Sequence, residues 1–475
     1  MIRRIAFFFV STIQLQAQIG GIQELAIKES SAYRWLEQLS DGIGGRLTGS
    51  PEAAKAEQWA ADTMKQIGLA NIHLERYKID RGWQRGTAQA EIVSPIRLPL
   101  NATSYGWAGS TPSAKGLEAS VVLVKRDSLA AEMRNSAAWA GKILCVSSTG
   151  GSVIQFYSQL GAFVIEAQKQ KAAAIILRDA RPGAMLTHTG PVTFDGAIYT
   201  ISVLDISAEH QLRLERLLKA GTPVRLRITV SNRFSSGPVE AANVVGEIAG
   251  REQAEQVVIL SAHLDSWDLG TGAIDDGAGV ATVLGAAEAI VKSGKKPRRT
   301  IRFILFTGEE QGLLGSRAYV RQHKAEMPNV ICALALDWGQ GPIAALPLAG
   351  RNELTASFAE LSALVKDVQP LEIVSTYLTF TDAYSFTLAG VAGLAFYQNS
   401  KDYTLIGHSA ADMFDKVDAA VLSRNTATAA ITAFWIADHS NRIAAHWSQE
   451  RVVQQLVEDK QRPMLEALGL WAFPQ

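Results

Sequence analysis

The sequence predicts an α/β sandwich built around a mostly parallel β-sheet, into which a β-rich region is inserted. From residue 241 onward, short aliphatic runs alternate with helical stretches, the pattern of a parallel sheet covered by helices. Between residues 105 and 232, β-rich runs and turn signals dominate instead. A chain of 475 residues is long enough for two or three domains at roughly 150 residues each.

The composition excludes several other classes of protein. The chain carries 46 Lys and Arg against 46 Asp and Glu, so it offers no general attraction to nucleic acid or to an anionic membrane. Its 47% hydrophobic and 19% charged residues are ordinary for a globular protein and exclude a mostly disordered chain. Cys145 and Cys332 fall in different predicted domains, so we expect two buried thiols and no disulfide framework.

The N-terminus has the pattern of a secretory signal peptide. Arg3 and Arg4 precede an apolar run from Ile5 to Ile13, which is about half of the ~20 residues that a membrane-spanning helix needs. We expect a signal peptide over residues 1–20 and a secreted or periplasmic protein, the alternative being a disordered or partly buried strand. No later segment is apolar and long enough to span a membrane, so no membrane partner is expected for the mature form.

The first predicted elements are helices between residues 29 and 69. Apolar residues recur at helical spacing on both sides of a glycine-rich loop, residues 42–51, whose Ser50-Pro51 suits a helix start. No strand precedes this loop and no phosphate-binding lysine lies in it, so it does not predict a nucleotide site.

The β-rich region combines three predicted strands with two predicted helices. The strands are Val121–Val124, Ile143–Val146 and Ala174–Leu177, and the helices are Ser152–Lys171 and Ala208–Ala220. The region holds no paired carboxylates and no clustered histidines, so no catalytic site is expected there.

The remainder of the chain alternates regularly between strands and helices. The predicted strands are Val257–Leu260, Thr300–Phe306, Ile331–Leu336 and Ala392–Tyr397, and the predicted helices are Gly279–Lys292, Gly315–His323 and Ala419–Asp438. This alternation is the main reason to expect a mostly parallel sheet.

Acidic and histidine residues follow four of these strands directly. They are His263 and Asp265 after the first, Glu309 and Glu310 after the second, Asp337 after the third, and His408 and Asp412 after the last. Asp275 and Asp276 open the helix between the first two strands. Because ligands gather at the carboxyl ends of strands in open α/β sheets, we expect these side chains to converge.

Two histidines and three carboxylates without a cysteine suit zinc or a similar divalent ion. Five ligands are too many for one tetrahedral site, but they suit two metals about 3.5–4 Å apart if one carboxylate bridges. Glu309 and Glu310 point in different directions, so one can bind metal while the other acts as a base. Singly, each residue could be an ordinary helix cap or turn residue.

The motifs resemble those of the co-catalytic zinc exopeptidases, a family of bacterial aminopeptidases and glutamate carboxypeptidases. The motifs are His263-x-Asp265, Asp275 with its Gly-x-Gly, Thr-Gly-Glu309-Glu310, Asp337 and His408-x-x-x-Asp412. Within this family, residues 261–268 and 44–50 are similar to the carboxypeptidase Q subfamily. The middle region, with Gly141-Lys142-Ile143, looks like a protease-associated domain.

The resemblance implies a phosphorylase/aminopeptidase-like α/β sandwich with three segments. Residues 1–20 would be the signal peptide, residues 21–104 and 233–475 the zinc peptidase domain, and residues 105–232 an inserted protease-associated domain.

The resemblance also implies a role for each candidate residue. His263 and Asp337 would hold one zinc, Glu310 and His408 the other, and Asp275 would bridge them. Glu309 would be the general base, passing a proton from the attacking water to the leaving amine. Asp265 would orient His263 through its second ring nitrogen. Asp412 would either support His408 or cap the next turn.

One position departs from the family pattern. Many family aminopeptidases have a tyrosine directly before the last histidine, placed to steady the tetrahedral oxyanion, and this chain has Gly407 there. Tyr403 and Tyr384 are the two candidates to replace it.

The function expected from the resemblance is that of a secreted two-zinc exopeptidase acting on dipeptides or short peptides. The alternatives are an aminopeptidase acting on longer peptides, a single-zinc glutaminyl cyclase, and a receptor-like binding protein that has lost catalysis. Retention of all five ligands and the base argues against the last of these. The sequence is compatible with a homodimer but does not predict one.

Overall fold

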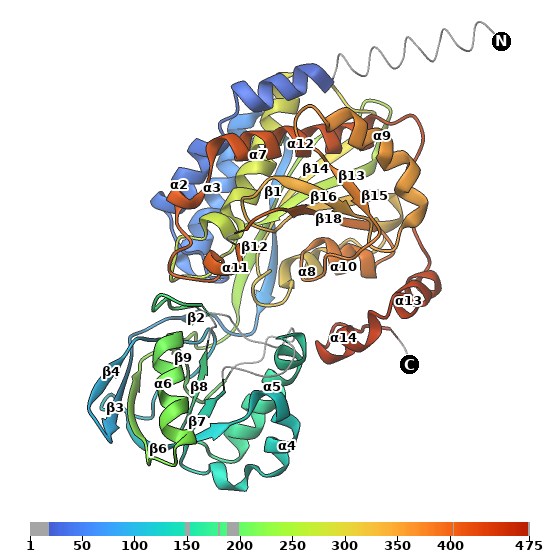
Figure 1. The fold of residues 1–475 in the computed structure, drawn as a ribbon. Helices are drawn as coiled ribbons and strands as arrows, with labels where there is room; N and C mark the ends of the chain where they lie inside the picture. Colours follow the sequence, from blue (N-terminus) through green and yellow to red (C-terminus); the bar gives the residue numbers. More distant parts are fainter. Residues whose placement is uncertain (1–18, 148–152, 179–180, 188–198, 402, 474–475) are drawn as a thin grey trace, which may run out of the picture.

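The computed structural model describes residues 19–147, 153–178, 181–187, 199–401 and 403–473. Most of the predicted signal peptide, residues 1–18, therefore lies outside the described residues. The described chain forms two eight-stranded sheets in two bodies (Figure 1). The second sheet lies in the sequence between two strands of the first, so the second body is an insertion.

The first sheet is parallel at its centre and antiparallel towards its edges. In spatial order its strands are β1 (Ala70–Ile79), β12 (Val239–Ile248), β14 (Arg299–Phe306), β13 (Gln253–His263), β15 (Val330–Leu336), β18 (Ala392–Gln398), β16 (Ile343–Pro347) and β17 (Glu372–Val374). Strands β14, β13, β15 and β18 run parallel to one another. Strands β1, β12 and β16 pair antiparallel with their inner neighbours.

Helices cover both faces of this sheet, as expected for an α/β sandwich (Figure 1). One face packs against α2 (Ala32–Gly42), α3 (Pro51–Ile67), α7 (Ala278–Lys292), α9 (Thr355–Val365) and α12 (Ala419–Asp438). The other face packs against α8 (Leu314–Gln322) and α10 (Ala383–Leu388). Two further helices, α13 (Gln449–Glu458) and α14 (Arg462–Ala467), follow near the C-terminus.

The alternation of side chains in β13 shows why this strand lies at the centre. Val258 and Leu260 belong to the core beneath α7 and α12, whereas Val257 and Ile259 belong to the core beneath α8 and α10. Successive side chains of a strand point to opposite faces, so a strand that is apolar at every position is buried on both.

The second sheet belongs to a region that we call the inserted region, residues 88–230. Its strands in spatial order are β4 (Leu98–Leu100), β3 (Ala88–Ser94), β10 (Arg225–Val230), β6 (Leu117–Val124), β7 (Ile143–Val146), β8 (Ala174–Arg178), β9 (Val203–Ile206) and β5 (Ala102–Ser104). Its helices are α4 (Leu129–Arg134), α5 (Val153–Lys169) and α6 (Ala208–Lys219). A short pair, β2 (Trp83–Gln84) and β11 (Arg233–Phe234), lies beside it in the sequence.

The inserted sheet begins earlier than the boundary predicted at residue 105. Strands β3, β4 and β5, which lie between residues 88 and 104, pair within the second sheet. The sequence pattern did not predict these strands because they are short and are polar or contain proline. Only their pairing in the folded structure assigns them to the second sheet.

The predicted central elements are confirmed, whereas the outer strands of the first sheet were missed. Strands β13, β14, β15 and β18 contain the predicted runs, and α7, α8 and α12 match the predicted helices within one or two residues. Strands β1, β12, β16 and β17 were not predicted. Cys145 on β7 and Cys332 on β15 are both buried and unpaired, as expected.

Candidate metal centre

Three central strands end side by side, and each presents a candidate residue there. His263 is the last residue of β13, and its neighbour β15 is followed directly by Asp337. On the other side of β13, β14 is followed by the turn that carries Glu309 and Glu310. The predicted convergence at the carboxyl end of the sheet is therefore present.

Asp275 and Asp276 lie in a single helical turn, η3 (Ala273–Gly277), between β13 and α7. The peptide bond that joins them is cis. The carboxylate of Asp276 accepts hydrogen bonds from the main-chain N–H groups of His263 and Gly279, each at 3.1 Å. Asp276 therefore ties the end of β13 to the start of α7, and a side chain at Gly279 would overlap its carboxylate.

The first half-site consists of His263, Asp275 and Asp337. Nε2 of His263 lies 3.1 Å from Oδ1 of Asp275 and 3.4 Å from Oδ1 of Asp337. All three residues are buried. Although burial disfavours the charged imidazole, the neighbouring carboxylates raise the pKa of His263 well above its usual value.

The second half-site consists of Asp275, Glu310 and His408. Nε2 of His408 lies 3.0 Å from Oδ2 of Asp275 and 3.1 Å from Oε2 of Glu310. His408 comes from the loop after β18, and its side chain is 28% exposed, against 1% for His263. The two carboxylate oxygens of Asp275 thus face different histidines, which is the arrangement that a bridging ligand requires.

The donor set fits two divalent cations. In each half-site one ligand atom from each residue lies within 4.8 Å of the others. Oε1 of Glu310 and Oδ2 of Asp337 are buried and have no hydrogen-bond partner within the described part of the chain. Burial raises the pKa of Asp337 to about 7, because desolvation and nearby carboxylates disfavour its charge. A largely buried cluster of two histidines and three carboxylates is suited to zinc.

Glu309 is not part of either ligand group but lines the same pocket. The pocket has a volume of about 210 Å³, and its walls are Asp275, Glu309, Glu310, Gly312, Asp337, Trp338, Phe380, Tyr403 and His408. Two larger pockets, of about 520 and 570 Å³, contain none of the six candidate residues. The candidate site is therefore identified by the residues that line the pocket and not by the volume of the pocket.

Asp265 contacts the second ring nitrogen of His263 mainly through its main chain. Nδ1 of His263 lies 3.0 Å from the main-chain carbonyl oxygen of Asp265 and 3.7 Å from its carboxylate. The carboxylate instead accepts from the N–H groups of Glu309 and Glu310, at 3.3 and 3.4 Å, and from the hydroxyl of Thr48 at 2.9 Å. Asp265 therefore orients His263 through its main chain and positions the Glu309–Glu310 turn through its side chain.

Asp412 supports Asp275 rather than His408. Its carboxylate accepts hydrogen bonds from the N–H groups of Ile274 at 2.7 Å and Asp275 at 3.2 Å. Burial raises the pKa of Asp412 to about 7 despite these bonds. The predicted roles were support of His408 and a cap on the following turn. Neither role describes these hydrogen bonds, because the loop that carries Asp412 folds back onto η3.

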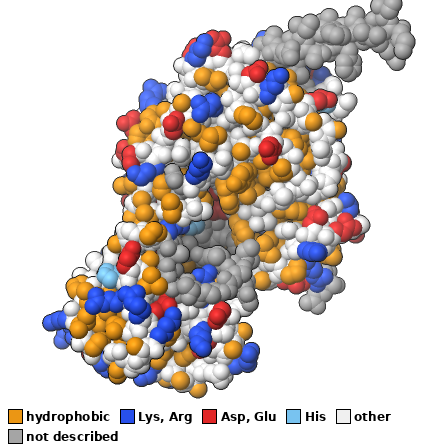
Figure 2. All heavy atoms as spheres, in the orientation of Figure 1, with side chains coloured by type: hydrophobic (Ala, Val, Ile, Leu, Met, Phe, Trp, Pro, Cys, Tyr) orange, Lys and Arg blue, Asp and Glu red, His pale blue; other side chains and the backbone are white. Residues whose placement is uncertain are grey.

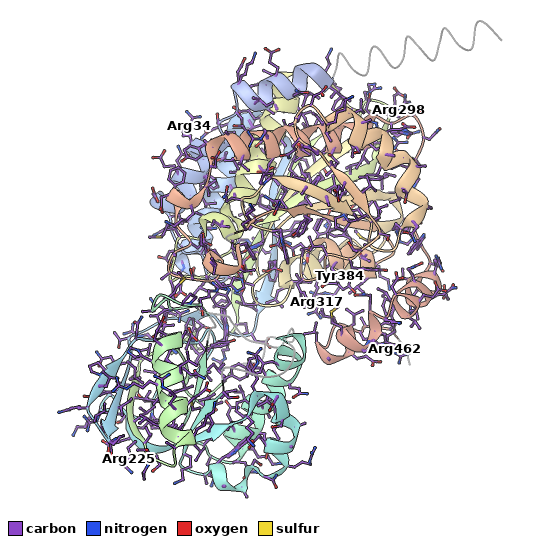
Figure 3. The ribbon with its side chains drawn as sticks, viewed as in Figure 1. Arg34, Arg225, Arg298, Arg317, Tyr384 and Arg462 are labelled. Carbon is purple, nitrogen blue, oxygen red and sulfur yellow. The ribbon has the colours of Figure 1, made fainter. Side chains whose placement is uncertain are left out.

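Tyr403, and not Tyr384, reaches the site. The Tyr403 hydroxyl donates to Oδ2 of Asp275 at 2.8 Å, and its ring stacks on Trp338 with centroids 5.6 Å apart. Tyr384 lies on α10, on the face of the sheet that α8 covers, and is not among the pocket residues (Figure 3). A Cβ at Gly407 would lie 3.0 Å from Cε2 of Tyr403, so the glycine makes room for this ring.

Arg46 and Thr48 in the glycine-rich loop were not predicted as site residues. Arg46 is completely buried and donates to the carbonyl oxygens of Leu264 at 2.7 Å, Thr271 at 2.6 Å and Gly272 at 3.0 Å. Burial lowers the pKa of Arg46 to about 10, although the nearby carboxylates favour its charged form. No local pattern predicts this role, because Arg46 binds main-chain atoms more than 200 residues away.

Trp267 is another contact that sequence pattern did not reveal. Its indole N–H donates to Oε2 of Glu310 at 2.6 Å, and its ring meets the His408 ring edge-on with centroids 6.2 Å apart. Trp267 thus touches both non-bridging ligands of the second half-site.

The chain is similar to known peptidases in sequence and in structure. Residues 243–433 match the model of peptidase family M28. Human carboxypeptidase Q is 30% identical over 417 residues, which cover 86% of each protein. The chain belongs to peptidase family M28. As a member of this family it is a zinc metallopeptidase, and its predicted enzyme class is confirmed.

Solved structures agree with this assignment. A peptidase M28 precursor from Shewanella amazonensis superposes with a TM-score of 0.82 at 28% identity, covering 91% of this chain and 99% of that one. A zinc aminopeptidase from Bacillus subtilis has a TM-score of 0.66 at 19% identity, covering 88% and 97%, which shows the fold alone. The predicted α/β architecture is confirmed at this level.

The surface and the helices show no strong signal for other kinds of partner in the part of the chain that the structure describes. Lys and Arg side chains are interspersed with Asp and Glu on the face shown in Figure 2, in keeping with the balanced composition. Among the described residues, no helix is both long and apolar enough to cross a membrane.

Proposed function

We propose that the chain is a two-zinc exopeptidase that hydrolyses the peptide bond of dipeptides and other short peptides. One observation carries the proposal: Asp275 places one oxygen 3.1 Å from His263 and the other 3.0 Å from His408. A single carboxylate between two histidine-containing groups supports a bridged pair of ions, because one ion would leave half of these donors unused.

His263, Asp275 and Asp337 would hold one zinc, and Asp275, Glu310 and His408 would hold the other. Bound zinc would lower the pKa of the attacking water and polarise the peptide carbonyl. Glu309 lines the pocket but belongs to neither group, which leaves its carboxylate free to take the proton from the water and give it to the leaving amine. The carboxylate of Asp265 holds the turn that aims Glu309.

Tyr403 is proposed to stabilise the tetrahedral oxyanion. Its hydroxyl lies at the pocket wall, close to the bridging carboxylate, and can turn its O–H towards a negative oxygen formed there. Stacking on Trp338 fixes the ring, so the donor is positioned before the reaction begins.

The pocket supports a short substrate. Its volume of about 210 Å³ lies below the ~300–1,000 Å³ of ordinary small-molecule sites, and Trp338 and Phe380 form apolar walls. A pocket of this size suits the few atoms on either side of one peptide bond. The carboxypeptidase Q relatives favour carboxypeptidase activity, and an aminopeptidase acting on longer peptides is the alternative.

The decisive experiment replaces Glu309 with glutamine. We expect kcat on a dipeptide to fall by about 10²–10⁴-fold, because a general base is lost, while the protein still binds two zinc ions per chain. Glu326→Gln, a matched change outside the pocket, should leave kcat unchanged. Near-normal hydrolysis by Glu309→Gln would reject Glu309 as the base, and fewer than two zinc ions in the wild type would reject the bridged pair.

The same preparation settles specificity. Dipeptides, amino-terminally blocked dipeptides and peptides of about ten residues would be compared. Preference for unblocked dipeptides supports the proposal, whereas release of N-terminal residues from the long peptides supports an aminopeptidase.

Two further assignments complete the proposal. The inserted region is proposed to be a protease-associated domain, because its mixed sheet is flanked by helices and interrupts the peptidase sheet. Export through a signal peptide over residues 1–20 is proposed from the basic and apolar N-terminal residues. N-terminal sequencing of the mature protein tests the second assignment.

A further inference from the structure

The loop that carries Tyr403 and His408 is bound by the inserted region. Arg181 donates to the carbonyl oxygens of Leu405, at 3.4 Å, and Gly407. On the other side of His408, the N–H of Ala410 donates to the carbonyl oxygen of Leu186 at 3.2 Å. A β-bridge joins Thr187 to Ser409. Segment 181–187 of the inserted region therefore contacts the residues on both sides of His408.

This segment is itself fixed to the second sheet. The N–H and the hydroxyl of Thr187 both donate to Oδ2 of Asp205, each at 3.1 Å. Asp205 lies on β9 and is 3% exposed. Thr187 therefore connects the loop that carries His408 to a buried strand of the inserted sheet.

His408 has a backbone conformation that depends on such contacts. Its φ angle is 55°, in the left-handed region that residues other than glycine rarely adopt. A conformation of this kind is strained and persists where neighbouring contacts hold it. The carbonyl oxygen of Gly407 and the N–H of Ala410, both held by segment 181–187, lie close to His408 in the chain.

Tryptophan side chains form a second connection between the inserted region and the same half-site. Trp107, in the inserted region, meets Trp267 edge-on with ring centroids 6.3 Å apart. Trp267 in turn donates to Oε2 of Glu310 and packs against His408. Trp107 and Trp267 are each 3% exposed, so both contacts are buried.

The first half-site is held differently. The main-chain N–H of His263 donates to Asp276, and its ring contacts the main chain of Asp265 and the carboxylates of Asp275 and Asp337. These partners all follow strands of the first sheet or lie in η3.

We propose that the inserted region holds the second half-site in its metal-binding geometry. Its contacts, made directly by Arg181 and by Trp107 through Trp267, set the affinity of the second zinc and not of the first. The inference rests on the proposed two-zinc function. It makes Arg181 and Trp267 positioning residues, since each acts through a ligand or the loop that carries one.

Metal binding tests the proposal without reference to activity. Asp337→Ala leaves only the second half-site complete, and Glu310→Ala leaves only the first. In the Asp337→Ala protein, adding Arg181→Ala should weaken zinc binding by about 10–100-fold, the usual effect of losing support for a ligand. In the Glu310→Ala protein, the same addition should leave the zinc affinity unchanged. Calorimetric titration of chelator-treated protein measures both.

Further variants make the test specific. Arg225→Ala removes another arginine of the inserted region, which pairs with Glu118 at its outer surface, and should change neither affinity (Figure 3). Trp267→Phe keeps the ring but removes the donor to Glu310, and should weaken only the second half-site. Arg181→Lys should restore part of the loss. Far-UV circular dichroism confirms that each variant is folded.

The outcomes separate this inference from the proposed function. Unchanged zinc affinity after Arg181→Ala in the Asp337→Ala protein overturns the inference, as does an equal loss in the Glu310→Ala protein. A wild-type protein that binds a single zinc overturns the two-zinc function instead.

Discussion

The two half-sites use similar ligands but are held in place by different parts of the molecule. His263 ends strand β13 and Asp337 follows the neighbouring strand β15, and their side chains are 1% and 8% exposed. His408 follows β18 on a loop that the inserted region contacts, and its side chain is 28% exposed. A metal-binding side chain at a strand end would inherit the rigidity of the sheet, whereas one on a loop would need support from other parts of the molecule.

The largest expected effect comes from the one residue that the half-sites share. Asp275→Ala removes a ligand from both, so we expect zinc content below one ion per chain and a fall in kcat/KM of about 10⁴-fold, at the upper end of the range expected for Glu309→Gln. Asp337→Ala and Glu310→Ala should each retain one zinc. Elemental analysis after dialysis measures all three, and two tightly bound ions in Asp275→Ala would contradict the bridge.

A smaller effect should follow loss of the Tyr403 hydroxyl. Tyr403→Phe is expected to lower kcat by about 10²–10³-fold with little change in KM and with both zinc ions retained, because oxyanion stabilisation acts in the transition state. Tyr384→Phe is the matched control and should behave as the wild type, since that ring lies outside the pocket. The proposed role fails if the two variants have equal kcat.

The smallest expected effect concerns stability away from both half-sites. His323 contacts Glu326 at 3.0 Å and Glu75 at 3.0 Å, and these bonds raise its pKa to about 9. The stabilisation is therefore complete below the unfolded pKa of about 6.5 and is lost as the pH rises through about 9. We expect His323→Gln to lower the free energy of unfolding by about 1–2 kcal/mol at pH 6 and by less at pH 10.

Urea denaturation at the two pH values measures the His323 effect. The variant also separates global stability from metal binding. Because His323 lies away from both half-sites, we expect the His323→Gln protein to retain two zinc ions per chain. An equal loss at both pH values would show that the His323 contacts do not depend on its charge.

The central sheet and the candidate ligands could be predicted because both leave local signals. The apolar runs of β13, β14 and β15 mark strands buried on both faces, and the acids and histidines directly after them mark the functional edge. The edge strand β1 left no such signal, since polar and charged residues occupy much of it.

The supporting contacts could not be predicted because they join distant parts of the chain. Arg46 binds main-chain carbonyls near residue 270, and Trp107 reaches Trp267 from the inserted region. Asp412 was correctly placed near the site, but its partner is the main chain of Asp275 and not His408. Spacing along a sequence predicts which residues share an edge, whereas hydrogen-bond partners depend on how loops fold back.

The packing of Tyr403 over Gly407 has a consequence for how such chains are recognised and how they diverge. A Cβ at position 407 would lie 3.0 Å from Cε2 of Tyr403, so a tyrosine there would require the Tyr403 ring to move. We therefore expect the residues at positions 403 and 407 to change together. A search pattern that demands tyrosine beside the final histidine would overlook this chain, whereas Tyr-x-x-x-Gly-His would detect others with the same arrangement.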